Sequence, residues 1–260
     1  MAEPSVKTPS NEHSRQTKER IKGVFSSQVL TKIGTGTTMR KSIQKSYFFV
    51  QELDDGTIEV QPLNVNYVPS GPKQILSKDE FLEKFSPEPE FYTITVMPKM
   101  RELEKTIARG DRHRKRGETF SAEMEYGSAV RVDEENVRAN FGLGLTYLER
   151  GATDKAQDIF ERLVKLEAAY ESEHKHLFNE FGINLRKNKM IDQALDYYAR
   201  ALELSKNDEN LYYNIARVCL EKKDIPKTVE MLTKALEINP EMPEAHKFMD
   251  FLKSKGLAKT

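Results

Sequence analysis

The stretch Lys175–Met242 reads KHLFNEFGINLRKNKMIDQALDYYARALELSKND for residues 175–208 and ENLYYNIARVCLEKKDIPKTVEMLTKALEINPEM for residues 209–242. Small and apolar residues stand at matching places in the two halves, 34 residues apart. The matched pairs are Gly182 and Ala216, Leu185 and Cys219, Ala194 and Thr228, Tyr198 and Leu232, and Ala201 and Ala235. A fixed period of this length predicts an array of helix–turn–helix units.

The same period continues toward the N-terminus, once a four-residue insertion near Glu171–His174 is allowed. One step back it matches Gly144, Tyr147, Ala156, Phe160 and Leu163, and a second step matches Gly110, His113, Ala122, Tyr126 and Ala129. We therefore predict four repeats, which cover Leu103–Asn136, Val137–Tyr170, Lys175–Asp208 and Glu209–Met242. A capping helix over 243–257 is expected to follow, because the last unit of such an array needs a cover with a polar outer side.

The second helix of the third repeat shows why such units stack. Its apolar residues recur at the three- and four-residue spacing of an amphipathic helix, at Ala194, Leu195, Tyr198, Ala201 and Leu202. Alanine and glycine stand where two helices must approach closely, and larger residues fill the gaps between them. One helix pair cannot bury its own apolar face, so neighbouring pairs stack into a solenoid.

These residues resemble the tetratricopeptide repeat (TPR) family, whose signature is a small residue and then an aromatic one in the first helix, with two alanines around an aromatic in the second. The last repeat also closes with the typical phrase Ala235–Pro240, although Thr228 stands where the family usually has alanine. The first repeat matches least, with Arg109 and His113 at places where the family has Leu and Tyr. We interpret it as a divergent or capping repeat.

The resemblance implies a non-catalytic adaptor, scaffold or chaperone-like protein. In such arrays the first helix of each pair lines a concave groove that accepts a peptide or helix of a partner protein. Placed on that plan, the partner-binding side carries arginines for carboxylates, asparagines for an extended backbone, and aromatic anchors. An equally weighted interpretation is that about half of these residues only cover the neighbouring helix. The expected set is Arg138, Phe141, Leu145, His176, Asn179, Ile183, Arg186, Asn210, Tyr213 and Arg217.

Residues 23–97 differ in pattern and predict a small α+β unit that contains a β-hairpin. The clearest strands are Tyr47–Leu53 and Thr57–Leu63. A two-residue turn between them would place two glutamates directly opposite each other, which like-charge repulsion disfavours. We therefore expect a three-residue loop with Gly56 in the left-handed conformation, which pairs Val50 with Val60. Taken whole, the chain should be mostly α, with a TPR-type solenoid over 98–260 after this unit.

Two further elements are expected in the α+β unit. Ile75 and Leu76 can form a short strand, and Ser77–Glu80 is a capping box that opens a helix with Phe81, Leu82 and Phe85 on one side. Phe91–Val96 reads as an extended apolar run, after which Pro98 suits the first turn of the next helix.

Basic residues gather in two segments, 15–45 and 101–116. Residues 1–22 are polar and predict a disordered tail that becomes basic toward its end. Both segments are read first as solvated surface, and the alternatives for each are a contact with nucleic acid, as in a nucleic-acid-associated adaptor, or with an acidic partner protein. Gly34–Lys41 lacks the Gly-Lys-Ser/Thr of a phosphate-binding loop, so we favour a flexible connection between strands over a phosphate site.

Composition excludes several other classes. The 41 basic and 41 acidic residues cancel, so no overall field favours nucleic acid or an acidic membrane. The one cysteine, Cys219, allows no disulfide framework, and no apolar run is long enough to span a membrane, so a cytoplasmic protein is expected. The histidines and Cys219 lack zinc spacing, and no catalytic arrangement, metal site or cofactor motif is evident. We expect no enzyme activity, and the oligomeric state is left open.

Overall fold

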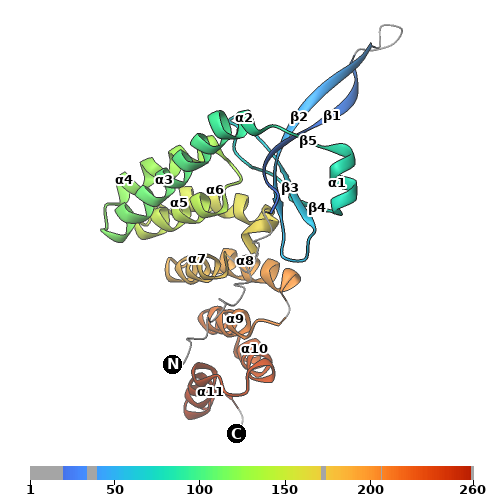
Figure 1. The fold of residues 1–260 in the computed structure, drawn as a ribbon. Coiled ribbons are helices and arrows are strands. Elements are labelled where there is room, and N and C mark those ends of the chain that lie inside the picture. Colours follow the sequence, from blue (N-terminus) through green and yellow to red (C-terminus); the bar gives the residue numbers. More distant parts are fainter. Residues whose placement is uncertain (1–19, 34–39, 171–173, 206, 259–260) are drawn as a thin grey trace, which may run out of the picture. The chain divides into compact units, whose positions relative to one another are not determined.

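The computed structural model describes residues 20–33, 40–170, 174–205 and 207–258, and the chain divides into two compact units (Figure 1). The sheet unit comprises Met1–Gln61 and Lys73–Pro89, and the helical unit comprises Pro62–Pro72 and Glu90–Thr260. This division differs from the single boundary near residue 97 that the sequence indicated. Residues 62–72 and 90–97 belong with the helices.

The sheet unit is a five-stranded sheet with one short helix, in the strand order β4-β3-β2-β1-β5. The long strands β1 and β2 pair antiparallel, with Phe25 opposite Phe48. The short β5 also pairs antiparallel with β1, and β4 with β3. The elements are β1 (Lys22–Ile33), β2 (Arg40–Glu52), β3 (Ile58–Pro62), β4 (Gln74–Leu76), α1 (Lys78–Lys84) and β5 (Ser86–Pro87).

The loop between β2 and β3 is the predicted three-residue loop. The Leu53 N–H donates to the Thr57 carbonyl at 2.9 Å, and Gly56 adopts a φ of +84°. Glycine has no Cβ to clash in this left-handed conformation, so it can occupy the position at low cost. Val50, Ile58 and Val60 are buried together with Phe81 of α1.

Helix α1 begins at the predicted capping box, where the Ser77 hydroxyl accepts a hydrogen bond from the Glu80 N–H at 3.3 Å. Phe81 is fully buried, with its ring 4.9 Å from that of Phe25 and 5.2 Å from that of Phe85. The expectation for Leu82 was wrong, because this side chain is exposed. Residues four apart share a helix face, whereas the neighbour of Phe81 lies about 100° around the helix.

The expectation of an extended run at Phe91–Val96 was also wrong. This segment is helical. It comprises the last residue of α2 (Pro89–Phe91) and a π-helical turn (Tyr92–Val96), which continues directly into α3 (Met97–Lys115). The Met97 N–H donates to the Tyr92 carbonyl, five residues back. Pro98 follows directly, has no N–H to donate, and would clash with the carbonyl four residues before it in a regular helix. The wider turn accommodates this proline within one continuous helical segment.

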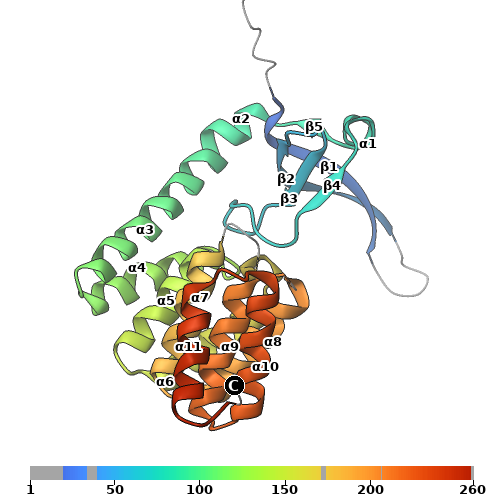
Figure 2. The same ribbon diagram turned by 90° about the horizontal axis from the view of Figure 1, so that it is seen from below.

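The helical unit confirms the predicted mostly α fold of four helix–turn–helix repeats and a capping helix (Figures 1 and 2). The first helices of successive repeats contact one another, from α3 to α5, α7 and α9. The repeats consist of α3 and α4 (Thr119–Val132), α5 (Val137–Glu149) and α6 (Thr153–Lys165), α7 (Lys175–Lys187) and α8 (Ile191–Leu204), and α9 (Glu209–Glu221) and α10 (Ile225–Ile238). A short 3-10 helix (Glu167–Tyr170) follows α6, and α11 (Pro243–Ser254) caps the array.

Glycines in the first helices allow close approach of the second helices. A Cβ on Gly182 would collide with the ring of Tyr198, and one on Gly110 would lie only 2.8 Å from ring atoms of Tyr126. Both tyrosines are buried. The first repeat, although divergent in sequence, therefore uses the same glycine–tyrosine packing as the third.

The segment Pro62–Pro72 completes the first repeat of the helical unit. Val68 is buried in the helical core, and the side-chain amides of Asn64 and Asn66 each donate to the Val132 carbonyl at 2.9 Å. Val132 is the last residue of α4, where carbonyl groups lack partners within the helix. The Ser70 hydroxyl also donates to Asp133, the C-cap residue, at 2.6 Å. The loop thus supplies hydrogen-bond donors to the C-terminus of α4.

Candidate functional site on the first helices

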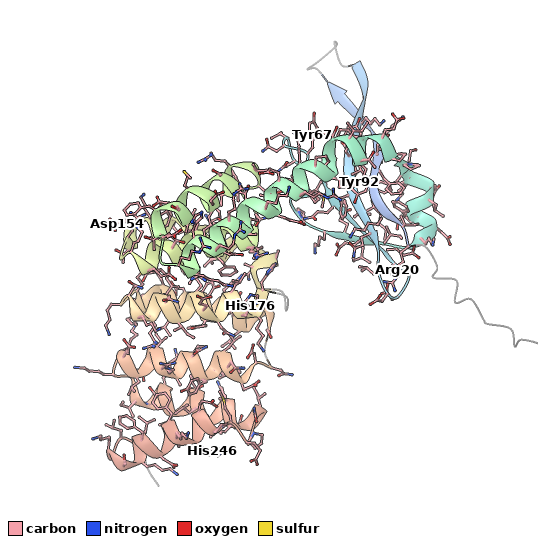
Figure 3. All side chains as sticks on the ribbon, turned by 60° about the vertical axis from the view of Figure 1, so that its left-hand side comes forward. Arg20, Tyr67, Tyr92, Asp154, His176 and His246 are labelled. Carbon is pink, nitrogen blue, oxygen red and sulfur yellow. The ribbon has the colours of Figure 1, made fainter. Side chains whose placement is uncertain are left out.

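The predicted partner-binding residues come from α5, α7 and α9, at spacings that place them on one side of each helix. His176, for example, lies in the first turn of α7 with an exposed side chain (Figure 3). Eight of these residues are at least partly exposed, and we call the surface that they form the first-helix face. It comprises Arg138, His176, Asn179, Ile183, Arg186, Asn210, Tyr213 and Arg217.

Phe141 and Leu145 do not belong to this surface, which corrects the prediction for both. Each side chain has 0% of its area exposed. The ring of Phe141 packs 5.8 Å from that of Phe181 in the next repeat, in an edge-to-face arrangement. These two residues therefore form the core between repeats 2 and 3 and are not available to a partner.

Two of the three predicted arginines are already engaged within the protein. Arg138 forms an ion pair with Asp111 of α3, and Arg186 forms one with Glu221 of α9. Only 14% of the Arg186 side chain is exposed. Lys189 also contacts Glu221, at 3.0 Å. Both arginines therefore connect first helices of neighbouring repeats, in line with the equally weighted interpretation that about half of the set covers a neighbouring helix.

A related set of ion pairs surrounds Arg114, which sequence reasoning missed. Its guanidinium lies 2.7 Å from a Glu149 oxygen and 3.0 Å from a Glu180 oxygen. Burial acts to lower the pKa of Arg114, but the hydrogen bonds and charges of the two glutamates outweigh it and raise the pKa. Glu149 follows Arg114 by the same interval as Glu221 follows Arg186, one residue more than the repeat period. A search for opposite charges at that interval would have found both pairs.

Arg217 differs from the other two arginines. Its guanidinium lies 5.9 Å from the centre of the Tyr213 ring, and it makes no ion pair with any residue in the described part of the chain. Tyr213 in turn lies edge-to-face on Phe248 of the capping helix, with ring centres 6.0 Å apart. One turn further along α11, Phe251 is 46% exposed. This end of the first-helix face combines an unpaired cation with aromatic rings.

The asparagines lie between these charged groups. The Asn214 amide is 3.5 Å from the side-chain oxygen of Asn179, a long contact between α9 and α7. Asn210 lies in the first turn of α9 and directs its side-chain amide toward Glu209 at 3.4 Å. Asn179 and Asn210 are partly exposed, and because both contacts are long, their side chains can exchange them for hydrogen bonds to another polypeptide.

Comparison with protein families decides the classification. Two tetratricopeptide repeat models match residues 107–173 and 185–250, together about half of the chain. The chain belongs to the tetratricopeptide repeat family. Both matched segments lie within the array 98–260 whose repeats were predicted from the 34-residue period.

Two curated proteins share parts of this repeat array. Anaphase-promoting complex subunit 3 of Schizosaccharomyces pombe is 26% identical over 153 residues, which cover 57% of this chain and 22% of that protein. The mitochondrial import receptor subunit TOM70 of Saccharomyces cerevisiae is 43% identical over 60 residues, 23% of this chain and 10% of that protein. The chain thus spans about a fifth and a tenth of these relatives. Among solved structures, a crystal structure of MamA is 23% identical to this chain and superposes with a TM-score of 0.47. The match covers 60% of this chain and 83% of the MamA chain.

Several predictions about this TPR protein lie outside the described residues. They concern the tail up to residue 19 and the glycine-containing stretch 34–39, so the phosphate-site and nucleic-acid interpretations of those segments stay untested. Within the described ranges, no helix is long and apolar enough to cross a membrane. In the same ranges, no three His, Cys, Asp or Glu side chains gather as a metal ion would require.

Proposed function

We propose that the chain is a protein-interaction scaffold whose first-helix face binds a peptide segment or helix of another protein. The TPR fold is typically a non-catalytic interaction module, and the curated relatives named above include a subunit of a complex and an import receptor. A cytoplasmic location and the absence of enzyme activity stay predictions from the sequence.

The observation that carries this proposal is the state of Arg217. An arginine above an aromatic ring keeps its N–H donors available, and its planar fork matches a carboxylate or a backbone carbonyl. Tyr213, which contacts Phe248 of the capping helix, adds apolar surface beside it. Aromatic residues and arginine are the residue types that dominate binding energy at protein interfaces.

The test is site-specific photo-crosslinking in extract from the native cell. A photoreactive amino acid replaces His176, which is exposed on the first-helix face, and in a matched protein it replaces Asp196, which is exposed on α8. We expect a defined crosslinked protein from position 176 and none from position 196. Equal crosslinking from both positions would reject the first-helix face as the binding surface.

A second variant tests the role of Arg217 itself. Arg217→Glu should reduce the crosslink at position 176 about tenfold or more, since it reverses the unpaired positive charge of the proposed binding surface. Lys223→Glu, an exposed change in the turn that follows α9, should leave it unchanged. Circular dichroism should show the same helicity for both.

A further inference from the structure

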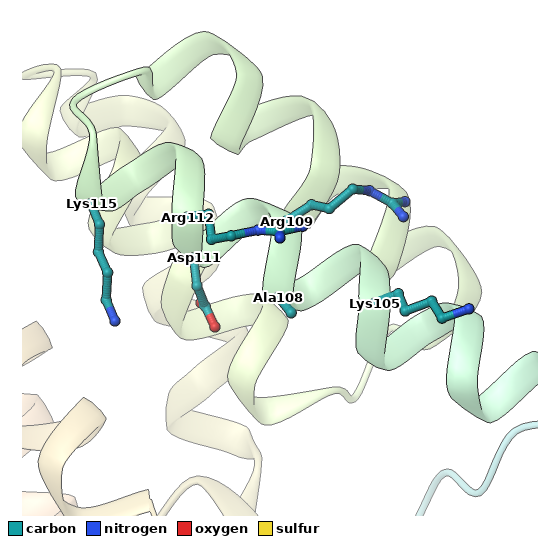
Figure 4. A pocket seen from close by; sticks show the side chains of 6 residues that line it. All are labelled: Lys105, Ala108, Arg109, Asp111, Arg112 and Lys115. Atoms are coloured by element: carbon teal, nitrogen blue, oxygen red, sulfur yellow. The ribbon is translucent and has the colours of Figure 1, made fainter.

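Helix α3 carries a hollow of about 490 Å³ on its surface. Figure 4 shows the six side chains that line it, with Lys105 and Lys115 at opposite ends and Ala108 and Asp111 between them. Arg109 and Arg112 complete the lining. Four of the six residues are basic, and they differ in whether an acidic side chain balances their charge.

Arg109 is engaged within the protein. Its guanidinium lies 3.1 Å from a Glu125 oxygen and 3.4 Å from a Glu102 oxygen. The hydrogen bond with Glu125 is the main cause that raises the pKa of Arg109. Lys105, Arg112 and Lys115 are exposed, and none of them forms an ion pair with another described residue. Three positive charges are therefore left without a counter-charge.

The carboxylate of Asp111 does not cancel these charges, because both of its oxygens are occupied. The Tyr126 hydroxyl donates to Oδ1 at 2.6 Å, and Arg138 binds Oδ2. Burial and the hydrogen bond with Asp111 raise the pKa of Tyr126, so the phenol keeps its proton and stays a donor. The charge of Asp111 is balanced by Arg138, and the hollow keeps a positive surplus.

The spacing of the free cations sets the size of a ligand. A helix rises 1.5 Å per residue, so Lys105 and Lys115 are about 15 Å apart along the axis. An extended polypeptide advances about 3.3 Å per residue and covers this length with about five residues. We propose that the hollow binds a short Asp/Glu-rich segment of a protein partner, which deepens the proposed function and rests on it.

The lining favours an acidic peptide over nucleic acid. Single-stranded nucleic acid is bound by aromatic side chains that stack on bases, beside a basic groove that follows the backbone. No aromatic residue lines the hollow, so the bases of a nucleic acid would have no ring to stack on. An extended acidic segment can direct several carboxylates toward the free cations, since every second side chain faces the same way.

The test measures fluorescence anisotropy of a labelled probe with the full-length chain at about 0.05 M salt, where surface charges are weakly screened. The probe is a fluorescein-labelled decapeptide in which glutamate alternates with alanine. A second peptide has glutamine in place of every glutamate, and a labelled ten-residue oligo-dT stands for nucleic acid. We expect binding of the glutamate peptide, about tenfold weaker binding of the glutamine peptide, and weaker binding of oligo-dT.

A matched pair of triple variants locates the site. Lys105→Gln with Arg112→Gln and Lys115→Gln should weaken binding of the glutamate peptide about tenfold. The control removes three exposed lysines of the capping region, by Lys247→Gln, Lys253→Gln and Lys255→Gln, and should change it less than about twofold. All six residues are exposed, so both proteins should keep the parent's circular dichroism spectrum.

Three results would overturn the proposal: no binding of the glutamate peptide, equal losses in the two triple variants, or tighter binding of oligo-dT that depends on the same three residues. Arg217→Glu should bind the glutamate peptide as the parent does. A failure of the first-helix face in the crosslinking experiment is therefore distinguishable from a failure of the hollow.

Discussion

The junctions between repeats differ along the helical unit. Between repeats 1 and 2, and again between repeats 3 and 4, an arginine of one first helix reaches a glutamate of the next, from Arg114 and Arg186 respectively. Between repeats 2 and 3 the equivalent places hold Leu148 and Lys187, which cannot form such a pair. The core rings of Phe141 and Phe181 join these repeats instead.

Other cations of the same helices have no such partner. Lys105, Arg112 and Lys115 surround the hollow on α3, and Arg217 lies above an aromatic ring on α9. The comparison shows that an arginine on a first helix is not by itself a ligand-binding residue. The acidic residues of the surrounding helices decide whether a cation is held within the protein, as Arg138 is by Asp111, or left unpaired.

The largest effect on stability should come from removing the arginine that connects repeats 1 and 2. Arg114→Gln removes the partner of two glutamates, one of them only one-third exposed, and should lower the free energy of unfolding by about 1–3 kcal/mol. Arg112→Gln, two residues away and unpaired, should change it by less than about 0.5 kcal/mol. Urea unfolding followed by circular dichroism measures both. Similar values for the two variants would remove the distinction between the two kinds of cation.

A smaller and more selective effect is expected at the other junction. Arg186→Gln should lower the free energy of unfolding by about 1 kcal/mol, because Glu221 loses a partly buried partner. Arg217→Gln should leave stability within about 0.5 kcal/mol of the parent and weaken partner binding instead. Unfolding and binding should be measured on the same preparations. A destabilised Arg217→Gln protein would show that this arginine is structural too.

The smallest effect concerns the pH dependence of the junction at Glu221. Burial acts to raise the pKa of Glu221, but the hydrogen bonds from Lys189 and Arg186 outweigh it and the pKa is lowered. A carboxyl with a lower pKa in the folded state stabilises the protein above its unfolded pKa of about 4.3, and this stability is lost as the pH falls through the folded value.

Between pH 7 and pH 3 the parent should therefore lose on the order of 0.5 kcal/mol more stability than Glu221→Gln, which has no charge to lose. Urea titrations at the two pH values measure the difference. Asp250→Asn, an exposed change on the capping helix, is the control and should follow the parent. If Glu221→Gln lost as much stability as the parent, the Arg186–Glu221 pair would have no net effect on folding.

Much of the helical array follows from the sequence because each repeat places the same residue types at the same interval. The glycine–tyrosine packing of Gly110 with Tyr126 shows that even the divergent first repeat keeps this pattern. The segment Phe91–Val96 was mistaken for an extended run because its β-branched and aromatic residues favour extended backbone locally. Its helical continuation into α3 overrides that preference, and such tertiary effects cannot be seen in a short window.

The site was less accessible to prediction than the fold. Periodicity shows which side of a helix a residue lies on, but whether that residue is buried depends on the side chains that the next repeat packs against it. Phe141 and Leu145 are buried for that reason. The paired state of Arg138 and Arg186 depends on side chains from neighbouring helices, which a family pattern does not specify.

The loop 62–72 has a consequence for how this protein can be divided. Because Val68, Asn64 and Asn66 complete the first repeat while the residues on both sides of the loop belong to the sheet unit, the chain passes between the units three times. A truncated chain that starts at residue 90 would lack part of its own core. A single recombination point at residue 90 therefore cannot replace the whole helical unit with that of another family member, because residues 62–72 would stay behind.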